Sequence, residues 1–219
     1  MKHILKKLLT SFGLMFLLLT GTRYSFGQTN RFSDSIISTT TNFNYGSLNA
    51  ALRPYKYNYT GIQVGGYCES PISARFSLVK GVAFSIKGGN LLAKNQLTDT
   101  KLTTRLYSVD APVLFRMYFK RAYVNSGVYA GYILGGRIKT AAGENTPATS
   151  TAISFGNSPG EFHHWDFGAL IGGGYNFNLK RTVLTADVRY GYGLVSISSD
   201  IKRYNRMLGL SLILSRTRN

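Results

Sequence analysis

The amino-acid sequence predicts an all-β fold: an eight-stranded, up-and-down, antiparallel transmembrane β-barrel, preceded by a cleaved signal peptide. Long segments alternate apolar side chains with polar or glycine positions at a period of two, which is the pattern of β-strands. The connections between these segments alternate short and long, as in bacterial membrane barrels. The composition agrees, since 24 Gly, 15 Tyr and 13 Phe accompany only 5 Pro and 1 Trp.

Residues 1–27 are predicted to be the signal peptide. Lysines precede an apolar run over residues 8–19, and small residues stand just before a cut at Gln28. An uncleaved membrane anchor is the alternative, but the apolar run is short for a spanning helix. Residues 28–38 are polar and are predicted to be a periplasmic lead-in, so the outer-membrane β-barrel domain covers residues 39–219.

The strands that follow differ in how clearly they alternate. The first is the weakest, and the hairpin over residues 165–194 is the clearest. The predicted strands cover residues 41–49, 59–69, 75–88, 104–119, 123–135, 165–178, 183–194 and 207–215. Bacterial barrels place short turns and both termini in the periplasm and long loops outside. The order of connections therefore predicts the bacterial outer membrane, with both termini periplasmic.

The two faces of these strands have different predicted surroundings. In the hairpin one face is apolar and the other is mostly glycine with isolated charges, which suits a crowded barrel interior rather than water. The apolar face is therefore predicted to contact lipid, whereas a soluble lipocalin-like barrel would turn it inward. Aromatic residues at strand ends are predicted to lie at the membrane interfaces. They are Tyr107, Phe119, Trp165, Phe167, Tyr175 and Phe177.

Charged residues recur on the predicted inner face. They are Glu69, Lys87, Asp110, Arg116, Asp166, Asp187 and Arg189. An eight-stranded barrel has an interior just wide enough for side chains, and buried charges are tolerated only when they are paired. The residues are therefore predicted to form an interior charge network that fills the lumen. A narrow pore, with a proton or ion path along the same groups, is the alternative.

Residues 106–119 resemble the "Y-x-[IV]-[DE]-x-P-x-L-x-[KR]-x-Y-F" stretch of the PorT-like outer-membrane β-barrel family. Shorter matches occur at residues 127–134, 166–175 and 187–194, and the resemblance covers residues 40–215. It implies the barrel fold, and because some members serve protein secretion and gliding, it implies a type IX secretion accessory as an alternative function. The chain departs from this family in lacking an aromatic residue at its end.

Other classes of function are disfavoured by the residues. The chain has 26 Lys and Arg against 9 Asp and Glu, but the basic residues are scattered and no nucleic-acid-binding motif accompanies them. No nucleic acid is therefore expected, and anionic lipopolysaccharide together with membrane lipid is the predicted counter-charge. The chain is predicted to be a monomer whose outer loops, chiefly residues 136–162, contact a ligand, a surface polymer or partner proteins.

No phosphate-binding cofactor is expected, because Gly172–Gly174 lie in a strand and resemble no phosphate loop. No metal is expected either, because the third histidine, His3, lies in the predicted signal peptide. His163 and His164, with Glu161 and the nearby serines, raise a lipid-modifying enzyme as a weaker alternative. No motif defines a nucleophile, so the chain is predicted not to be an enzyme.

Overall fold

The computed structural model describes residues 35–46, 55–94, 99–143, 147–179, 182–199 and 202–216. The predicted signal peptide lies outside the described residues. The strands are β1 (Ser35–Gly46), β2 (Lys56–Tyr57), β3 (Tyr59–Pro71), β4 (Phe76–Leu91), β5 (Leu102–Phe119), β6 (Ala122–Thr140), β7 (Thr149–Ala152), β8 (Trp165–Asn178), β9 (Thr182–Gly193) and β10 (Asn205–Arg216). Within these ranges, no helix has the length and apolar character to cross a membrane.

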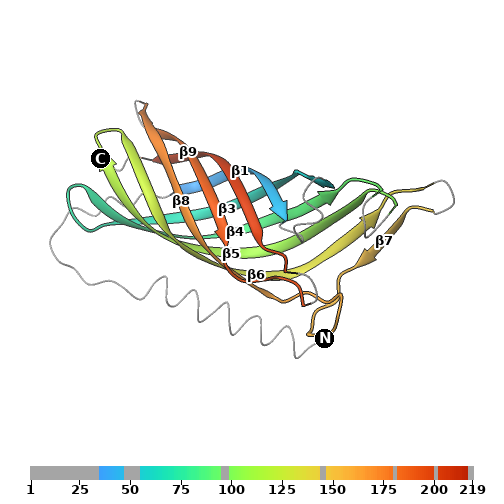
Figure 1. The fold of residues 1–219 in the computed structure, drawn as a ribbon. Coiled ribbons are helices and arrows are strands. Elements are labelled where there is room, and N and C mark those ends of the chain that lie inside the picture. Colours follow the sequence, from blue (N-terminus) through green and yellow to red (C-terminus); the bar gives the residue numbers. More distant parts are fainter. Residues whose placement is uncertain are drawn as a thin grey trace. The chain divides into compact units, whose positions relative to one another are not determined.

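The strands pair antiparallel, mostly with their neighbours in the chain (Figure 1). β3 pairs with β4, β4 with β5, and β5 with β6. β6 pairs with β8, past the short β7, and β8, β9 and β10 pair in turn. β1 pairs with β3 on one side and with β10 on the other. This order is the predicted up-and-down arrangement.

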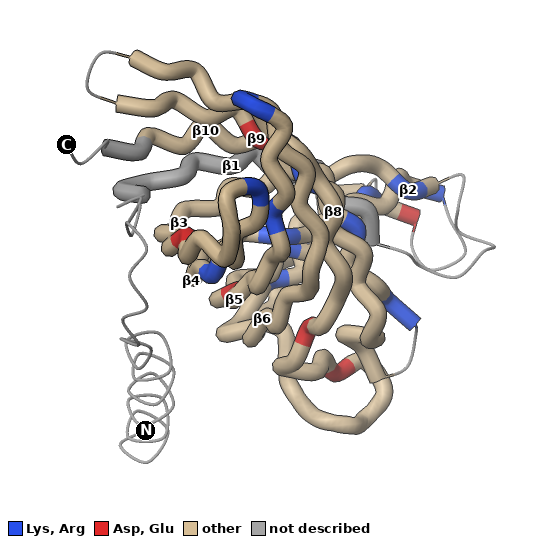
Figure 2. Tube along the Cα trace, turned by 90° about the vertical axis from the view of Figure 1, so that its left-hand side faces the viewer, with Lys and Arg blue, Asp and Glu red and all other residues tan. Residues whose placement is uncertain are grey.

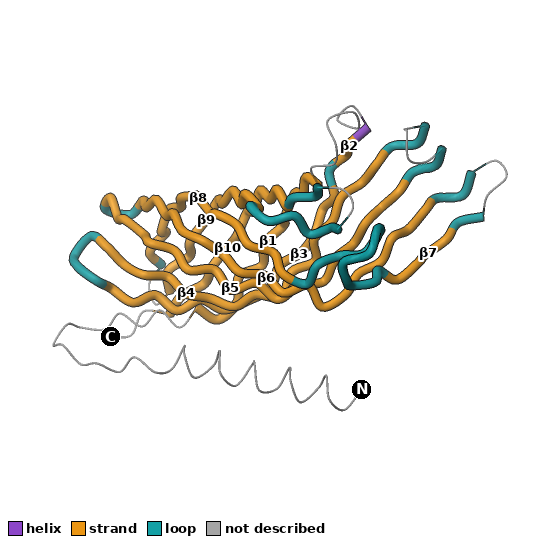
Figure 3. The backbone as a smooth tube through the Cα atoms, turned by 60° about the horizontal axis from the view of Figure 1, so that its bottom comes forward, coloured by secondary structure: helices purple, strands orange, loops and turns teal. Residues whose placement is uncertain are grey.

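The connections define two ends of the sheet. Short connections join β3 to β4, β5 to β6 and β8 to β9 at one end, here called the turn end. Longer connections join β4 to β5, β6 to β8 and β9 to β10 at the opposite end, here called the loop end. Their described residues are 92–94, 99–101, 141–143, 147–164, 194–199 and 202–204. The predicted alternation of short and long connections is confirmed. Figure 3 shows β2 and β7 at the loop end, where they pair with the last residues of β4 and β6.

Some strand bounds differ from the sequence prediction. β4 continues to Leu91 and β6 to Thr140, beyond the predicted strand ends, and β7 forms inside the predicted longest loop. β1 begins at Ser35, within the predicted lead-in. The extensions are held by backbone pairing from β4 through β5 and β6 to β7. Their side chains are mostly polar or glycine, so no apolar alternation marked them in the sequence.

The two faces of the sheet differ in burial as the alternation predicts. In β8, Asp166 is fully buried, whereas Trp165, Phe167 and Ile171 are 53, 41 and 63 % exposed. The face that holds Asp166 is called the inner face, and the other the exposed face. Large apolar side chains also stand on the exposed face of other strands: Ile62, Val64, Phe84, Val113, Phe115, Val124, Val128, Val188, Leu210 and Leu212. Soluble monomers rarely expose an apolar surface this extensive.

Candidate functional site

Lys87 on β4 is the centre of a buried group of charges. Its Nζ lies 2.8 Å from Asp110 Oδ1 on β5 and 3.1 Å from Asp166 Oδ2 on β8, and Lys87 is only 1 % exposed. The two carboxylates also accept hydrogen bonds from Tyr129 (3.1 Å), Asn205 (2.7 Å), Ser85 (2.6 Å) and Ser108 (3.2 Å). These seven residues form the Lys87 cluster. Pairing and hydrogen bonding offset the cost of removing its charges from water.

A second cluster lies nearer the turn end and is built around Arg116 on β5. Arg116 Nη1 donates to Glu69 Oε2 at 2.8 Å, and Glu69 also accepts hydrogen bonds from Tyr118 and Ser77. The guanidinium carbon lies 3.9 Å from the centre of the Tyr123 ring, within cation–π distance. We call Arg116, Glu69, Ser77, Tyr118 and Tyr123, together with the residues that Tyr123 joins to them, the Arg116 cluster.

Tyr123 joins Arg116 to the remaining predicted pair of charges. Its hydroxyl donates to Asp187 Oδ2 at 2.5 Å, and Asp187 Oδ1 lies 2.5 Å from Arg189 Nε. The Arg189 guanidinium carbon in turn lies 4.8 Å from the centre of the Tyr67 ring. The Arg116 cluster therefore extends across the inner face from β3 to β9.

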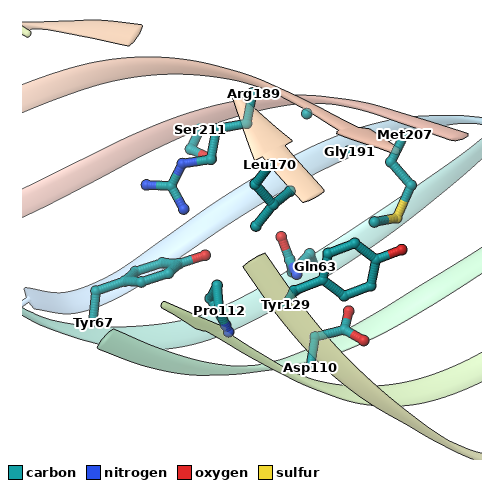
Figure 4. A pocket seen from close by; sticks show the side chains of 11 residues that line it. Gln63, Tyr67, Asp110, Pro112, Tyr129, Leu170, Arg189, Gly191, Met207 and Ser211 are labelled. Carbon is teal, nitrogen blue, oxygen red and sulfur yellow. The ribbon is translucent and has the colours of Figure 1, made fainter. Parts of the chain in front are cut away.

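A small cavity of about 40 Å³ is lined by residues from both clusters. In Figure 4, Tyr67 and Arg189 lie on one side of it and Asp110 and Tyr129 on the other. A buried water needs roughly 10–15 Å³ of such space, so the cavity has room for about three waters. Its lining combines these polar groups with apolar side chains, among them Pro112, Leu170 and Met207.

An apolar group covers the inner face at the loop end. Phe162, from the connection between β6 and β8, is 1 % exposed and packs with Leu106, Ile133 and Ile197. Ile197 comes from the connection between β9 and β10, so two long connections meet over the strand ends. These four residues are called the cap.

His163 joins the same two connections to each other, and His164 attaches the β6–β8 connection to β6. His163 contacts the Ser196 carbonyl through Nδ1 (3.1 Å) and the Ser199 hydroxyl through Nε2 (3.1 Å). His164 Nδ1 lies 2.8 Å from the Ile133 carbonyl, and its ring stacks on Phe155 at 3.9 Å. Glu161 makes its hydrogen bond with the Ser158 amide instead of a histidine. The contacts described for both rings are those of a packed loop.

The predicted interface aromatics lie at both ends of the exposed face. Trp165 and Phe167 stack at 5.5 Å where β8 begins, at the loop end, and Tyr175 and Phe177 lie 4.9 Å apart towards the turn end. Phe119, at the turn end of β5, is 54 % exposed, while Tyr107 is partly buried.

The seven predicted charged residues thus lie in two clusters. Sequence reasoning missed their uncharged partners: Ser77, Ser85, Ser108, Tyr118, Tyr123, Tyr129 and Asn205. A signal was present, because tyrosines among the glycines of an inner face have a hydroxyl that needs a partner when buried.

Gly168 on β8 makes room for one of these tyrosines. A Cβ at this position would overlap the Tyr129 ring and the Tyr192 carbonyl, whereas a Cβ at Gly135 on β6 would meet nothing within 4 Å. We expect Gly168→Ala to destabilise the protein by about 1–3 kcal/mol through overpacking. Gly135→Ala, its matched control, should change stability by less than about 1 kcal/mol. Urea unfolding in detergent micelles measures both, and equal losses would contradict the packing argument.

Comparison with known proteins gives a family and several distant structures. The family model described as "Outer membrane protein beta-barrel domain" matches residues 26–199. Among solved structures, the chain is similar to Ail, the attachment invasion locus protein of Yersinia pestis, determined in complex with the heparin analogue sucrose octasulfate. The identity is 12 %, the alignment covers 86 % of this chain and 99 % of that chain, and the TM-score is 0.41.

Two further structures have similar statistics. Neisserial surface protein A (NspA) has 12 % identity over 83 % of this chain and 96 % of that chain, with a TM-score of 0.43. The N-terminal β-barrel domain of Pseudomonas aeruginosa OprF has 13 % identity over 84 % of this chain and 99 % of that chain, with a TM-score of 0.31. No curated protein matches the chain significantly.

Proposed function

The chain belongs to the outer membrane protein beta-barrel domain family, and from this premise we propose that it is a closed, eight-stranded barrel with a filled lumen and an interaction role. It is a bacterial outer-membrane β-barrel protein. In the proposal, the long connections face the outside of the cell and contact protein partners. The PorT-like assignment and its secretion role remain the alternative, supported by the residue pattern at 106–119 and tested by loss of protein export on gene deletion.

Closure is supported by the order of strand pairing. β1 pairs with β10, and β4 pairs with β5, so each of the eight long strands has a partner on both sides. Lipid cannot satisfy the open backbone groups of a sheet edge, so a spanning sheet needs such pairing throughout. The short β2 and β7 are additions at the loop end.

The observation that carries the interaction role is the layering of the inner face. The cap, the Lys87 cluster and the Arg116 cluster follow one another from the loop end to the turn end. A lumen occupied in this way leaves little room for a solute path, which disfavours the narrow pore. Surfaces free to bind partners are then those of the long connections, and no catalytic role is assigned.

The proposed orientation places the turns and both termini in the periplasm, with residues 1–27 removed as a signal peptide and residues 28–38 as a lead-in. It is supported by the rule that outer-membrane barrels have short periplasmic turns and long outer loops. Exposed aromatic residues at both ends of the strands would form the two interface girdles. The barrel is proposed to be a monomer surrounded by membrane lipid and lipopolysaccharide.

Labelling of intact cells tests this orientation. Cys68, the sole cysteine, is first replaced by serine. Ser150→Cys on β7 and Ser73→Cys in the β3–β4 turn then give matched exposed thiols at opposite ends. We expect a membrane-impermeant maleimide to label Ser150→Cys on intact cells, and Ser73→Cys only after the outer membrane is permeabilised. Labelling of Ser73→Cys on intact cells, with Ser150→Cys labelled only after permeabilisation, would contradict the proposed orientation.

A further inference from the structure

The exposed face of β5 and β6 changes character towards the loop end. Its apolar part includes Phe115 and Val113 on β5, which are 46 and 42 % exposed, and Val128 and Leu134 on β6, which are 59 and 41 % exposed. Beyond Tyr107, the same face of β5 continues to Arg105. The change from apolar to basic side chains along this face is the one expected where the hydrocarbon core of a membrane ends and the lipid head groups begin.

Three cations occupy neighbouring positions beyond this transition. Arg105 lies directly opposite Arg137 in the β5–β6 pairing, and Lys139 is one step further along the same face of β6, opposite Thr103. Side chains directly opposite in an antiparallel pair are about 4.5–5.5 Å apart at Cβ, and diagonal neighbours remain within reach of long side chains. The Arg105 guanidinium carbon lies 5.8 Å from the centre of the Tyr59 ring, so the three positively charged groups converge on one anion when Arg105 turns from Tyr59 towards Arg137.

These cations have no acidic counterpart among the ion pairs of the described residues. The four pairs found there use Lys87, Arg116 and Arg189, all on the inner face. Like charges directly opposite each other on a sheet are destabilising. A bound anion would relieve this repulsion. Figure 2 marks Lys and Arg positions in blue around β2, with an acidic position in red beside them.

The backbone leaves open space beside the cations. β6 has a register irregularity between Ile133 and Gly135, and Gly135 lies opposite Tyr107. A Cβ at Gly135 would meet nothing within 4 Å. The strand surface is therefore open between Leu134, on the apolar side, and Arg137, on the basic side.

We propose that Arg105, Arg137 and Lys139, with the open space at Gly135, bind a phosphate group of lipopolysaccharide in the outer leaflet. Guanidinium groups make strong, paired hydrogen bonds to phosphate. The acyl chains of the same lipid lie along the exposed side chains of Val128 and Leu134. This site rests on the proposed function, because the loop end must meet the outer leaflet. It lies on the outer wall of the barrel, apart from both inner-face clusters and the cap.

Binding in detergent micelles tests the site without depending on orientation in cells. The folded full-length protein is titrated with diphosphorylated lipid A and, separately, with enzymatically dephosphorylated lipid A. We expect the wild type to bind the phosphorylated form at least about tenfold more tightly, because dephosphorylated lipid A cannot accept the charge-assisted hydrogen bonds that phosphate accepts. Equal affinity for the two lipids would overturn the proposal, whatever the behaviour of the variants.

Substitutions within the proposed site test which residues bind lipid A. Arg105→Gln combined with Arg137→Gln should weaken binding of phosphorylated lipid A at least about tenfold. The matched control, Arg75→Gln with Arg121→Gln, removes two exposed arginines from the turns and should leave affinity unchanged. Gly135→Val fills the open space while keeping every charge, and should also weaken binding. Equal losses in the first variant and its control would assign binding to general charge and reject the site.

Competition distinguishes a lipid site from a site for free anions. Inorganic phosphate and soluble polyphosphate carry the charge but no acyl chains. We expect neither to displace lipid A at matched phosphate concentration. Displacement by polyphosphate at an affinity equal to that of lipid A would replace the lipid with a soluble polyanion and overturn the assignment. The binding assay in micelles does not depend on the orientation of the protein in cells. A labelling result that contradicts the proposed orientation would therefore leave the binding results interpretable, and the two proposals can fail separately.

Discussion

Lys87→Met should lower the free energy of unfolding by about 3–5 kcal/mol, because it leaves two buried carboxylates without their counter-charge. Asp110 and Asp166 both depend on the Lys87 ammonium, and neither side chain is more than 4 % exposed. Folded proteins have a total stability of about 5–15 kcal/mol, so a large part would be lost. The measurement is the urea midpoint of the folded, heat-shiftable form in micelles.

Two further variants separate charge from packing. Lys80→Met makes the same substitution on the exposed face of β4, opposite Val113, and should cause no loss of stability. Adding Asp166→Asn to Lys87→Met removes one unpaired carboxylate and should recover part of the loss. A Lys87→Met protein as stable as the wild type, or a double variant weaker than the single one, would refute the counter-charge argument.

Phe162→Ala should release the long connections from the end of the barrel. Phe162 is 1 % exposed and belongs to a four-residue apolar cluster, so its truncation costs about 3–5 kcal/mol where the site cannot collapse. The substitution should lower the free energy of opening the β6–β8 and β9–β10 connections locally, and should leave the pairing of the strands unchanged. Since 1.4 kcal/mol corresponds to tenfold, tryptic cleavage after Lys202 should accelerate by about a hundredfold to a few thousandfold.

The control uses the same substitution at the opposite end. Phe177 is 46 % exposed near the turn end, so Phe177→Ala should leave the cleavage rate unchanged. Phe162→Ala should also remain non-conducting in planar bilayers, because the Lys87 cluster still fills the inner face beneath the cap. A protease rate equal to that of the wild type would show that Phe162 does not hold the loops. A steady conductance would show that the cap alone closes the lumen.

The prediction of faces from sequence succeeded because it needed only local information. In β8, the alternation of Trp165 and Phe167 with Asp166 and Gly168 assigns each side chain to one face of a strand, whatever strand lies beside it. The connections followed in the same way from the lengths of unpatterned segments. The last residues of β4 and β6 could not be predicted from alternation, because they are mostly polar or glycine and are held in the strands by pairing to neighbouring strands.

The partners of the buried charges required the tertiary structure. Asp166 contacts Lys87, which is 79 positions away in the chain, and Asn205, which is 39 positions away. Which inner-face residues stand at one level depends on the register between strands, and a shift of two residues would keep every face while changing every partner. The cap depends in addition on two connections folding towards each other.

The sequence by itself therefore determined the all-β class, the two faces and the alternation of turns and loops, because period-two patterning acts within each strand. Only the tertiary structure decided that Lys87 lies between two aspartates, that Phe162 and Ile197 meet, and that Arg105 stands opposite Arg137. The physical reason is that these contacts join distant segments, whose relative position is set by strand register and by the packing of the whole barrel.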